Sequence, residues 1–254
     1  MQINTKNFKR AFQYGKPVFH GVNHGIQILL DFIYPPHCIL CNIRLDAFHY
    51  LCPSCDLTLM NQKQMMVKSH QYDFPNLQKE LKLKQVCTLW HFENMIEDLI
   101  HRVKYQHEEK LGEWLGCHVE NQHLFFSQFV ALPLIVPVPL HTQRHRERGY
   151  NQSEFIARGI QHELGYPIST RILKRIRKTR TQTALTAEQR QQNVEDAFRV
   201  IKSDPIQNRP ILLVDDVITT GATMNQCAEV LLNAGSGDVY ALALARPLKS
   251  DVKN

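Results

Sequence analysis

The stretch ILLVDDVITTGAT, residues 211–223, runs from four apolar residues into two adjacent aspartates and then into small and hydroxylated residues. A continuous apolar run such as residues 211–214 is typical of a strand that is buried on both faces of a sheet. A helix is predicted over residues 224–234, ending at Gly235, and the N-terminus of such a helix presents unpaired backbone N–H groups to an anion such as phosphate. The stretch therefore predicts an anion site between a strand and a helix.

The residues between strand and helix indicate a phosphorylated sugar as the ligand. Small side chains over residues 219–223 let the backbone approach a phosphate, and the threonine hydroxyls add donors. Asp215 and Asp216 precede this turn by three to four residues, which suits acceptors for the hydroxyls of a ribose. No Gly-Lys-Ser/Thr sequence is present, so a P-loop nucleoside triphosphatase is excluded. The alternative is a structural role in which Asp215 caps the next turn.

Outward from this stretch, strands alternate with helices, which predicts an α/β fold with a mostly parallel sheet flanked by helices. The predicted strands cover residues 86–90, 129–138, 211–214 and 239–245, and the predicted helices cover residues 93–107, 109–121, 152–163 and 224–234. Asn151 is expected to cap the third of these helices, with Glu154 reaching back to it as in a capping box and Gly165 ending the helix.

The N-terminal third is organised differently. Residues 1–24 are polar and predict a loosely ordered arm, and a short apolar helix over residues 26–34 is expected to end before Pro35 and Pro36. Residues 61–85 are polar and are interpreted as a linker. The predicted parts are therefore an arm with a four-cysteine module (1–60), a linker (61–85) and an α/β domain (86–254).

Four of the seven cysteines form two Cys-x2-Cys pairs that predict a zinc site: Cys38, Cys41, Cys52 and Cys55. Disulfides are uncommon in cytosolic proteins, so metal binding is the better explanation for this spacing. Four protein ligands leave no coordination position for substrate, so the predicted Zn²⁺ is structural. The single cysteines Cys87, Cys117 and Cys227 are expected in the core.

Composition restricts the class of protein further. The chain has 254 residues, 43% hydrophobic and 21% charged, which describes a globular protein. No run approaches the roughly 18–20 apolar residues of a membrane-spanning helix, and the apolar residues 26–33 are interrupted by Asp31 and lack a signal-peptide cleavage site. We therefore expect a cytoplasmic protein without a transmembrane segment.

The net charge of +6 is concentrated in one part of the chain. Residues 141–199 contain 12 Lys and Arg against 6 Asp and Glu. Such a segment suggests a polyanionic partner, either nucleic acid or a pyrophosphate, and a solvated basic surface is the alternative.

Residues 211–223 resemble the thirteen-residue binding motif of type I phosphoribosyltransferases, whose ligand is phosphoribosyl pyrophosphate (PRPP). The four-cysteine module and three further stretches are similar to the ComF family of competence-associated proteins: VKYQHEEKLGEWLG (103–116), VPVPLHTQRHRERGYNQ (136–152) and RIRKTRTQTALTAEQRQQNVEDAF (175–198). The resemblance implies a phosphoribosyltransferase-like domain with a zinc module. It also implies action in natural transformation on incoming single-stranded DNA, at the cytoplasmic side of the inner membrane.

The resemblance implies individual roles as well. Asp215 and Asp216 would face the ribose hydroxyls, and the 5′-phosphate would lie against the turn of Thr219, Thr220, Gly221, Ala222 and Thr223, with Mg²⁺ accompanying PRPP. Residues 136–139, which include Val138 and Pro139, occupy the position of the pyrophosphate loop, where backbone N–H groups are expected to meet the pyrophosphate.

Each group of basic residues around this site has two possible roles. Arg144 and Arg148 suit phosphate oxygens, or form an exposed face. Lys104 and Tyr105 resemble the Lys-Tyr pair near the site in the family, or Lys104 interacts with a helix dipole. A further set lies in the segment that forms a mobile lid in PRPP-using relatives, or grips a nucleic-acid backbone: Arg175, Arg177, Lys178, Arg180, Gln182 and Arg190.

Three functions follow. The favoured one is a competence protein that binds PRPP with Mg²⁺ and holds single-stranded DNA on its basic surface. The second is an active phosphoribosyltransferase with an unidentified nitrogen acceptor, although purine-salvage enzymes of this fold have an acid where this chain has Thr219. The third is a scaffold whose zinc module docks on proteins of the DNA-uptake machinery, against which the intact aspartate pair and phosphate turn argue.

Overall fold

The computed structural model describes residues 35–47, 49–63, 66–68, 74, 77, 79–119, 123–127, 129–176 and 197–247. The chain forms two compact units, Met1–Gln62 and Lys63–Asn254. The N-terminal arm, the helix expected over residues 26–34 and five of the lid residues lie outside the described residues; these five are Arg177, Lys178, Arg180, Gln182 and Arg190.

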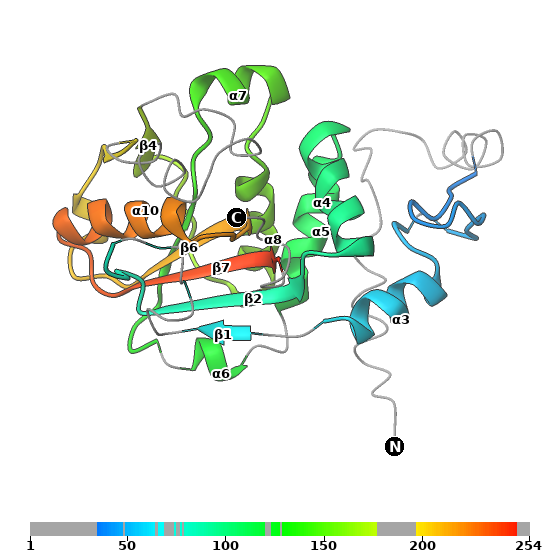
Figure 1. The fold of residues 1–254 in the computed structure, drawn as a ribbon, viewed down its shortest axis with the longest axis horizontal. Helices are drawn as coiled ribbons and strands as arrows, with labels where there is room; N and C mark the ends of the chain where they lie inside the picture. The colour runs from blue at the N-terminus through cyan, green and yellow to red at the C-terminus, as the bar shows by residue number, and fades with distance from the viewer. Residues whose placement is uncertain are drawn as a thin grey trace. The chain divides into compact units, whose positions relative to one another are not determined.

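A five-stranded sheet forms the centre of the second unit, in the order β1-β2-β7-β6-β3 (Figure 1). The strands are β1 (Met66–Lys68), β2 (Gln85–His91), β3 (Leu134–Pro137), β6 (Ile211–Val217) and β7 (Val239–Arg246). β1 pairs antiparallel with β2, and every other neighbouring pair is parallel. The predicted mixed α/β fold with a mostly parallel sheet is confirmed. β6 lies between two parallel partners, which explains why its apolar run is continuous.

Helices cover both faces of the sheet. α10 (Ala222–Asn233) buries Met224 and Cys227 against one face, together with Ile211 and Leu213 of β6. Alternate residues of a strand point to opposite faces, so Leu212 faces the other side, where α8 (Gln152–Leu164) packs on β6 and β3. α5 (Glu109–Gly116) packs on α8, and α4 (Asn94–Tyr105) packs on α5 (Figure 1).

The remaining elements are short. They are α3 (Pro53–Asn61) in the first unit and, in the second, the 3₁₀ turns Cys117–Val119 and Asp204–Ile206, the helices α6 (His123–Phe126) and α7 (Thr142–Arg148), and the two-stranded ribbon β4 (Leu173–Arg175) with β5 (Phe198–Val200). None of the described helices is long and apolar enough to cross a lipid bilayer. Cys87, Cys117 and Cys227 are buried, as predicted.

Three predicted elements need correction. The strand predicted over residues 129–138 begins only at Leu134, because Phe129 belongs instead to a cluster of aromatic rings with Phe125 and Tyr240. The helix predicted over residues 109–121 ends at Gly116 and tightens into a 3₁₀ turn. The predicted capping box is half formed: Asn151 accepts from the backbone N–H of Ser153, but the Glu154 carboxylate pairs with Arg158 at 2.6 Å.

The segment over residues 61–85, interpreted as a linker, belongs to the second unit from Lys63 onward. It supplies the edge strand β1, and its side chains of Phe74, Leu77 and Leu83 are buried in the core beside α10. Few apolar residues are scattered over this stretch, so its hydrophobic pattern does not reveal that it folds against the sheet. α7 was likewise not predicted, because its residues are almost all polar and its side chains are not buried.

Candidate functional site

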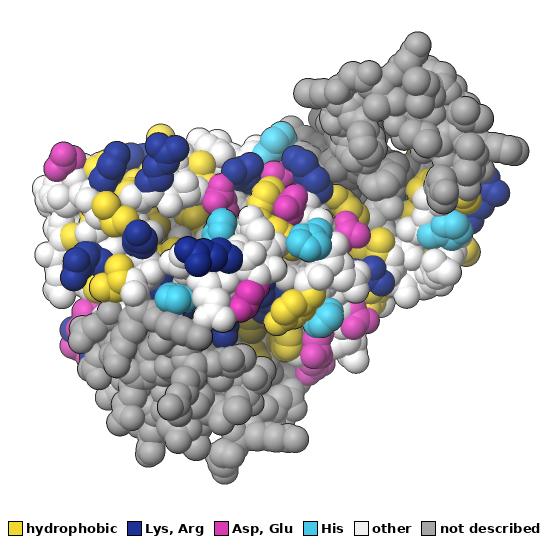
Figure 2. Space-filling view, turned by 90° about the horizontal axis from the view of Figure 1, so that it is seen from above, with side chains coloured by type: hydrophobic (Ala, Val, Ile, Leu, Met, Phe, Trp, Pro, Cys, Tyr) yellow, Lys and Arg dark blue, Asp and Glu magenta, His cyan; other side chains and the backbone are white. Residues whose placement is uncertain are grey.

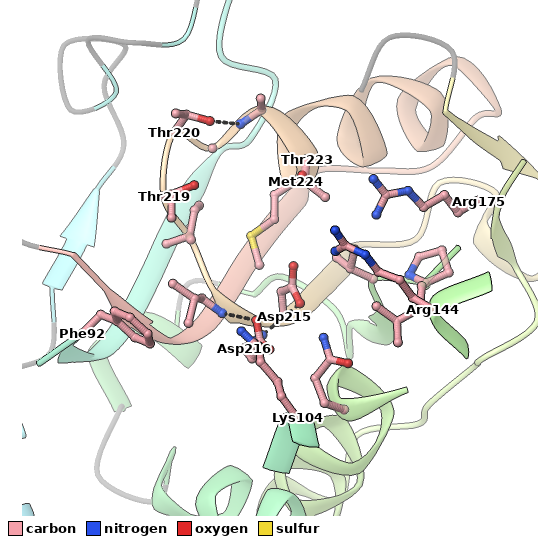
Figure 3. A pocket seen from close by; sticks show the side chains of 18 of the residues that line it. Phe92, Lys104, Arg144, Arg175, Asp215, Asp216, Thr219, Thr220, Thr223 and Met224 are labelled. Atoms are coloured by element: carbon pink, nitrogen blue, oxygen red, sulfur yellow. Dashed lines mark hydrogen bonds and ion pairs between the residues drawn. The ribbon is translucent and has the colours of Figure 1, made fainter. Parts of the chain in front are cut away.

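A pocket of about 280 Å³ opens where the parallel strands end (Figure 3). Its wall includes Phe92 after β2, Val138 after β3, Asp215 near the end of β6 and Pro247 after β7. The carboxyl ends of parallel strands meet at one edge of a sheet, and ligands of open α/β folds bind there. The position of the pocket therefore follows from the parallel topology.

The pocket brings together every predicted sugar-phosphate residue that the structure describes. These are Lys104, Tyr105, Val138, Pro139, Arg144, Arg148, Arg175, Asp215, Asp216, Thr219, Thr220, Gly221, Ala222 and Thr223. Sequence reasoning missed seven further lining residues: Phe92, Leu140, Gln152, Val217, Ile218, Met224 and Pro247. Residues more than a hundred positions apart thus share one cavity.

The two aspartates lie within β6 rather than after it, because the strand continues to Val217. Oδ1 of Asp215 accepts a hydrogen bond of 2.9 Å from the backbone N–H of Asp216, and Oδ1 of Asp216 accepts one of 2.7 Å from the N–H of Val217. A second bond to Oδ1 of Asp215 comes from the hydroxyl of Ser153 at 2.7 Å. Ser153 was not predicted, since nothing near it in sequence indicates a contact with β6.

Asp216 is paired with a cation inside the pocket. The Lys104 ammonium lies 2.9 Å from Oδ2 of Asp216, and only 22% and 7% of the two side chains are exposed. Lys104 stands in the last turn of α4, where the Tyr150 hydroxyl donates a hydrogen bond to the carbonyl of Val103. The ion pair therefore rests on a helix end that is itself anchored.

Asp215 has a different electrostatic environment. Burial raises the pKa of Asp215 to about 7, and the neighbouring Asp216 carboxylate raises it as well, while the bonds from Ser153 and the Asp216 N–H and the charge of Lys104 act in the opposite direction. Its environment therefore favours the protonated form more than water does. The side chain can give up that proton when a cation or a sugar hydroxyl binds.

The turn after β6 has the backbone of an anion site. Gly221 adopts a φ of +81° immediately before α10, which begins at Ala222, two residues before the predicted start. This left-handed conformation favours glycine. Phe74 packs behind the turn, and a Cβ on Gly221 would lie 2.9 Å from its ring. The turn before α10 therefore borders the pocket on one side and packs against the Phe74 ring on the other.

Three arginines approach the pocket from α7 and β4. Figure 3 shows Arg144 and Arg175 on one side, Thr219 and Thr220 on the other, and Asp215 between them. Arg175 is only 6% exposed, and its guanidinium lies 5.2 Å from the ring centroid of Phe198 on β5. Burial lowers the pKa of Arg175, yet a guanidinium remains charged at neutral pH. The pocket therefore has donors on two sides of a carboxylate pair.

The predicted role of the backbone at residues 136–139 is wrong. Pro137 and Pro139 have no N–H group, and the N–H of Val138 donates to the carbonyl of Val214 at 2.8 Å. The Val138 carbonyl accepts from the side-chain amide of Asn151 at 3.1 Å. Val138 and Pro139 line the pocket, but Val138 and the two prolines offer no free N–H group to a pyrophosphate.

The first unit contains the four predicted ligand cysteines in one cluster. Their sulfur atoms all lie within 4.8 Å of one another, and those of Cys41 and Cys52 are 3.6 Å apart. Tetrahedral zinc with Zn–S distances of about 2.3 Å separates its sulfurs by about 3.8 Å, so the cluster fits such a metal. Burial opposes ionisation of Cys38, but backbone hydrogen bonds from Cys41, Cys52 and Leu40 outweigh it and lower the pKa to about 7.

Comparison with known proteins identifies the family. No family model matches the chain. It is 30% identical to the DNA utilization protein YhgH of Escherichia coli K12 over 214 residues, 83% of this chain and 90% of that protein. It is 29% identical to Competence protein F of Haemophilus influenzae (82% and 90%) and 24% identical to Competence protein ComFC of Bacillus subtilis (82% and 77%). The chain belongs to the ComF family.

Solved structures similar to this ComF chain include phosphoribosyltransferases. A hypoxanthine phosphoribosyltransferase from Staphylococcus aureus is 15% identical, with a TM-score of 0.34, and the match covers 57% of this chain and 68% of that one. The allosteric regulatory enzyme of purine biosynthesis matches with 20% identity and a TM-score of 0.33 over 52% and 25% of the two chains. At such TM-scores, these matches carry no weight for the roles of individual residues.

Proposed function

We propose that this ComF chain handles single-stranded DNA during DNA uptake, on the cytoplasmic side of the membrane, and binds PRPP with Mg²⁺ in the pocket. The names of its relatives, competence proteins and DNA utilization proteins, support the first half of this proposal. The pocket supports the second half.

The arrangement of charge in the pocket carries the PRPP assignment. Anion donors lie on two sides, at the turn before α10 and at the arginines of α7 and β4, with Asp215 and Asp216 between them. PRPP has a phosphate at one end of a ribose and a pyrophosphate at the other. A ligand with this distribution of groups matches two anion sites that flank a pair of hydroxyl acceptors.

Each part of the ligand then has a named partner. The 5′-phosphate would lie at Thr219–Thr223 and the ribose hydroxyls at the two aspartates, while Arg144, Arg148 and Arg175 would contact the pyrophosphate. Mg²⁺ would neutralise phosphate oxygens and bring Asp215 to its charged form. Arginine suits the pyrophosphate side because its planar fork donates two bonds to phosphate oxygens.

The DNA assignment depends on the basic side chains around α7. His145 and Arg146 of this helix are exposed, and Arg144 and Arg148 lie at the pocket. Figure 2 shows Lys and Arg side chains in several groups over the face seen from above, with acidic side chains among them. Contacts of this kind are electrostatic, so DNA affinity should fall steeply as salt rises.

Zinc is the metal that we assign to the cysteine cluster of the first unit. Four thiolates complete its preferred coordination and leave no site for substrate, so its role is structural. The comparison with relatives does not depend on this metal, and its removal provides a separate test, described below.

Isothermal titration of PRPP with Mg²⁺ tests the pocket. The native chain is expected to bind, and the double variant Asp215→Asn, Asp216→Asn is expected to lose binding without a change in bulk fold. Asp238→Asn is a matched control, because Asp238 forms an exposed ion pair with Lys84 outside the pocket. Fluorescence anisotropy with a labelled single strand tests the DNA half, and absence of binding at low salt would overturn it.

A phosphoribosyltransferase is the second candidate, and the ionisation of Asp215 favours it. A carboxyl group whose pKa is about 7 can accept a proton from an attacking amine at neutral pH. Release of pyrophosphate from PRPP that depends on an added nitrogen nucleophile, across a panel of such nucleophiles, would establish transfer. Binding of PRPP without release would limit the site to a ligand or effector role.

A further inference from the structure

Among the aromatic side chains that line the pocket, that of Tyr105 is the most exposed to solvent. It lines the cavity, yet 64% of its surface is exposed. Its neighbour Lys104 turns inward to Asp216, so the last turn of α4 places one residue at the sugar site and the next at the mouth. Burial does not explain why an aromatic residue occupies this position.

The ring is held in place although it is exposed. The Arg148 guanidinium lies 5.3 Å from its centroid, and the ring of His101, one turn earlier on α4, lies 4.7 Å away at an interplanar angle of 45°. Arg148 is itself fixed by a hydrogen bond to Gln152. The bond from Tyr150 to Val103 anchors the helix end below. An aromatic ring that is both exposed and fixed loses little conformational entropy when it binds a ligand.

We propose that Tyr105 stacks an unpaired base of single-stranded DNA at the mouth of the sugar-phosphate pocket, an inference that rests on the proposed DNA-handling function. Every base has a planar face, so stacking on an aromatic side chain tolerates any sequence. The exposed Arg146, on the same helix as Arg148, would provide positive charge for the adjacent phosphates. Base and backbone would thus be bound at one place beside the pocket.

Stacking at Tyr105 would bring the DNA close to the proposed PRPP site. A strand stacked on Tyr105 would pass within one residue of Lys104 and hence of the Asp216 carboxylate. DNA and PRPP would then occupy adjoining sites, and any factor by which one changes the affinity for the other holds in both directions, because linkage is reciprocal. A free nucleobase offers the same planar ring, so the experiment must separate it from a base within a strand.

The test compares Tyr105→Ala and Tyr105→Phe with the native chain by fluorescence anisotropy. The probes are a labelled single strand of thymidines and an abasic strand of the same length, each measured at low and at moderate salt. Leu132→Ala is the control, because Leu132 is 65% exposed and lies outside the pocket. Free thymine and free adenine are also titrated into each variant, and their binding is measured by intrinsic fluorescence.

The expected result is a loss of about fivefold or more in affinity of Tyr105→Ala for the thymidine strand, little change for the abasic strand, and near-native behaviour of Tyr105→Phe. This loss should persist as salt rises, because stacking involves no counterion release, whereas the contribution of a phosphate contact falls with salt.

Equal weakening for both strands, or none for either, would overturn the stacking role while leaving DNA handling intact. Free bases that bind the native chain but not Tyr105→Ala, with strand binding unchanged in that variant, would also overturn it, because the ring would then serve a small molecule. A native chain that binds neither strand removes the proposed DNA function itself, and with it this inference.

Discussion

The Ser153 hydroxyl donates a 2.7 Å hydrogen bond to Oδ1 of Asp215, which joins the first turn of α8 to the end of β6. α8 is the helix that Asn151 caps, and Asn151 also donates to the carbonyl of Val138 after β3. One helix start therefore connects the ends of two neighbouring strands. The orientation and the ionisation of Asp215 both depend on that connection.

Replacing Ser153 by Ala should raise the pKa of Asp215 above its present value of about 7, because the Ser153 bond lowers it. A larger fraction of the carboxyl group is then protonated at neutral pH. We expect weaker PRPP binding at pH 7 that recovers by about pH 9, measured by titration calorimetry at several pH values. Ser236→Ala, at a serine bonded to Gly237 away from the pocket, should show no such shift. A uniform loss at every pH would contradict the explanation.

Asp215→Asn should stabilise the free protein at pH 8 while it impairs ligand binding. The folded-state pKa of about 7 lies above the ordinary value of 3.8, so folding favours the protonated form. That contribution is present below pH 4 and is lost as the pH rises through about 7. Asn accepts the same hydrogen bonds without a charge. Urea denaturation should therefore show a larger gain for the variant at pH 8 than at pH 5, and a gain independent of pH would argue against burial of the charge.

Lys104→Met should destabilise the protein by about 1–3 kcal/mol, because it leaves the buried Asp216 carboxylate without its cation. The matched control is Lys84→Met, which removes the pair with Asp238, whose two side chains are 52% and 55% exposed. An exposed pair contributes about 1 kcal/mol or less. Equal losses in urea denaturation would mean that Asp216 is solvated more fully than its exposure suggests.

Gly221→Ala should be more damaging than Gly165→Ala. Both glycines have positive φ, +81° and +70°, so each substitution costs about 1–2 kcal/mol of backbone strain. Only at Gly221 would the new Cβ meet a neighbour, the Phe74 ring at 2.9 Å, whereas nothing lies within 4 Å at Gly165. We expect a lower Tm for Gly221→Ala, loss of PRPP binding in that variant alone, and partial recovery of stability when Phe74→Leu is added.

Removal of metal should expose four thiols and leave three protected. After treatment with a strong chelator, the cluster residues Cys38, Cys41, Cys52 and Cys55 should react with a thiol reagent. Cys87, Cys117 and Cys227 are buried, and burial raises the pKa of Cys87 to about 12, so these should react only on unfolding. Metal analysis should find one zinc per chain before treatment. Seven reactive thiols in the folded, untreated protein would contradict both assignments.

Sequence reasoning found the parts of the site that are local in the chain. The turn at Thr219–Thr223 and the two aspartates form a continuous pattern. The hydrophobic pattern also shows that a strand is followed by a helix there. The cysteine pairs are equally local. Periodicity also predicted α8 and α10 to within a few residues, because each has an apolar face.

Contacts between distant residues could not be predicted in this way. The bonds of Ser153 to Asp215 and of Lys104 to Asp216 join residues 62 and 112 positions apart, and no local pattern announces them. α7 has no apolar stripe, so periodicity cannot detect it. The N–H groups at residues 136–139 were assigned to a ligand because pairing of Val138 with Val214 depends on the neighbouring strand, which sequence alone does not provide.

The side chains packed behind the turn at Thr219–Thr223 also set a time for its assembly. Asn225 on α10 accepts from the Lys82 backbone and donates to the Glu80 carbonyl, and Phe74 closes the turn at Gly221. Lys82 and Asn225 are 143 residues apart, so a ribosome adding about 5–20 residues per second makes the second about 7–30 s after the first. During synthesis, Phe74 therefore lacks its final packing partner, the turn at Gly221, for a similar time. A nascent chain of this protein would expose an aromatic side chain to chaperones throughout that interval, and the pocket would be among the last features to form.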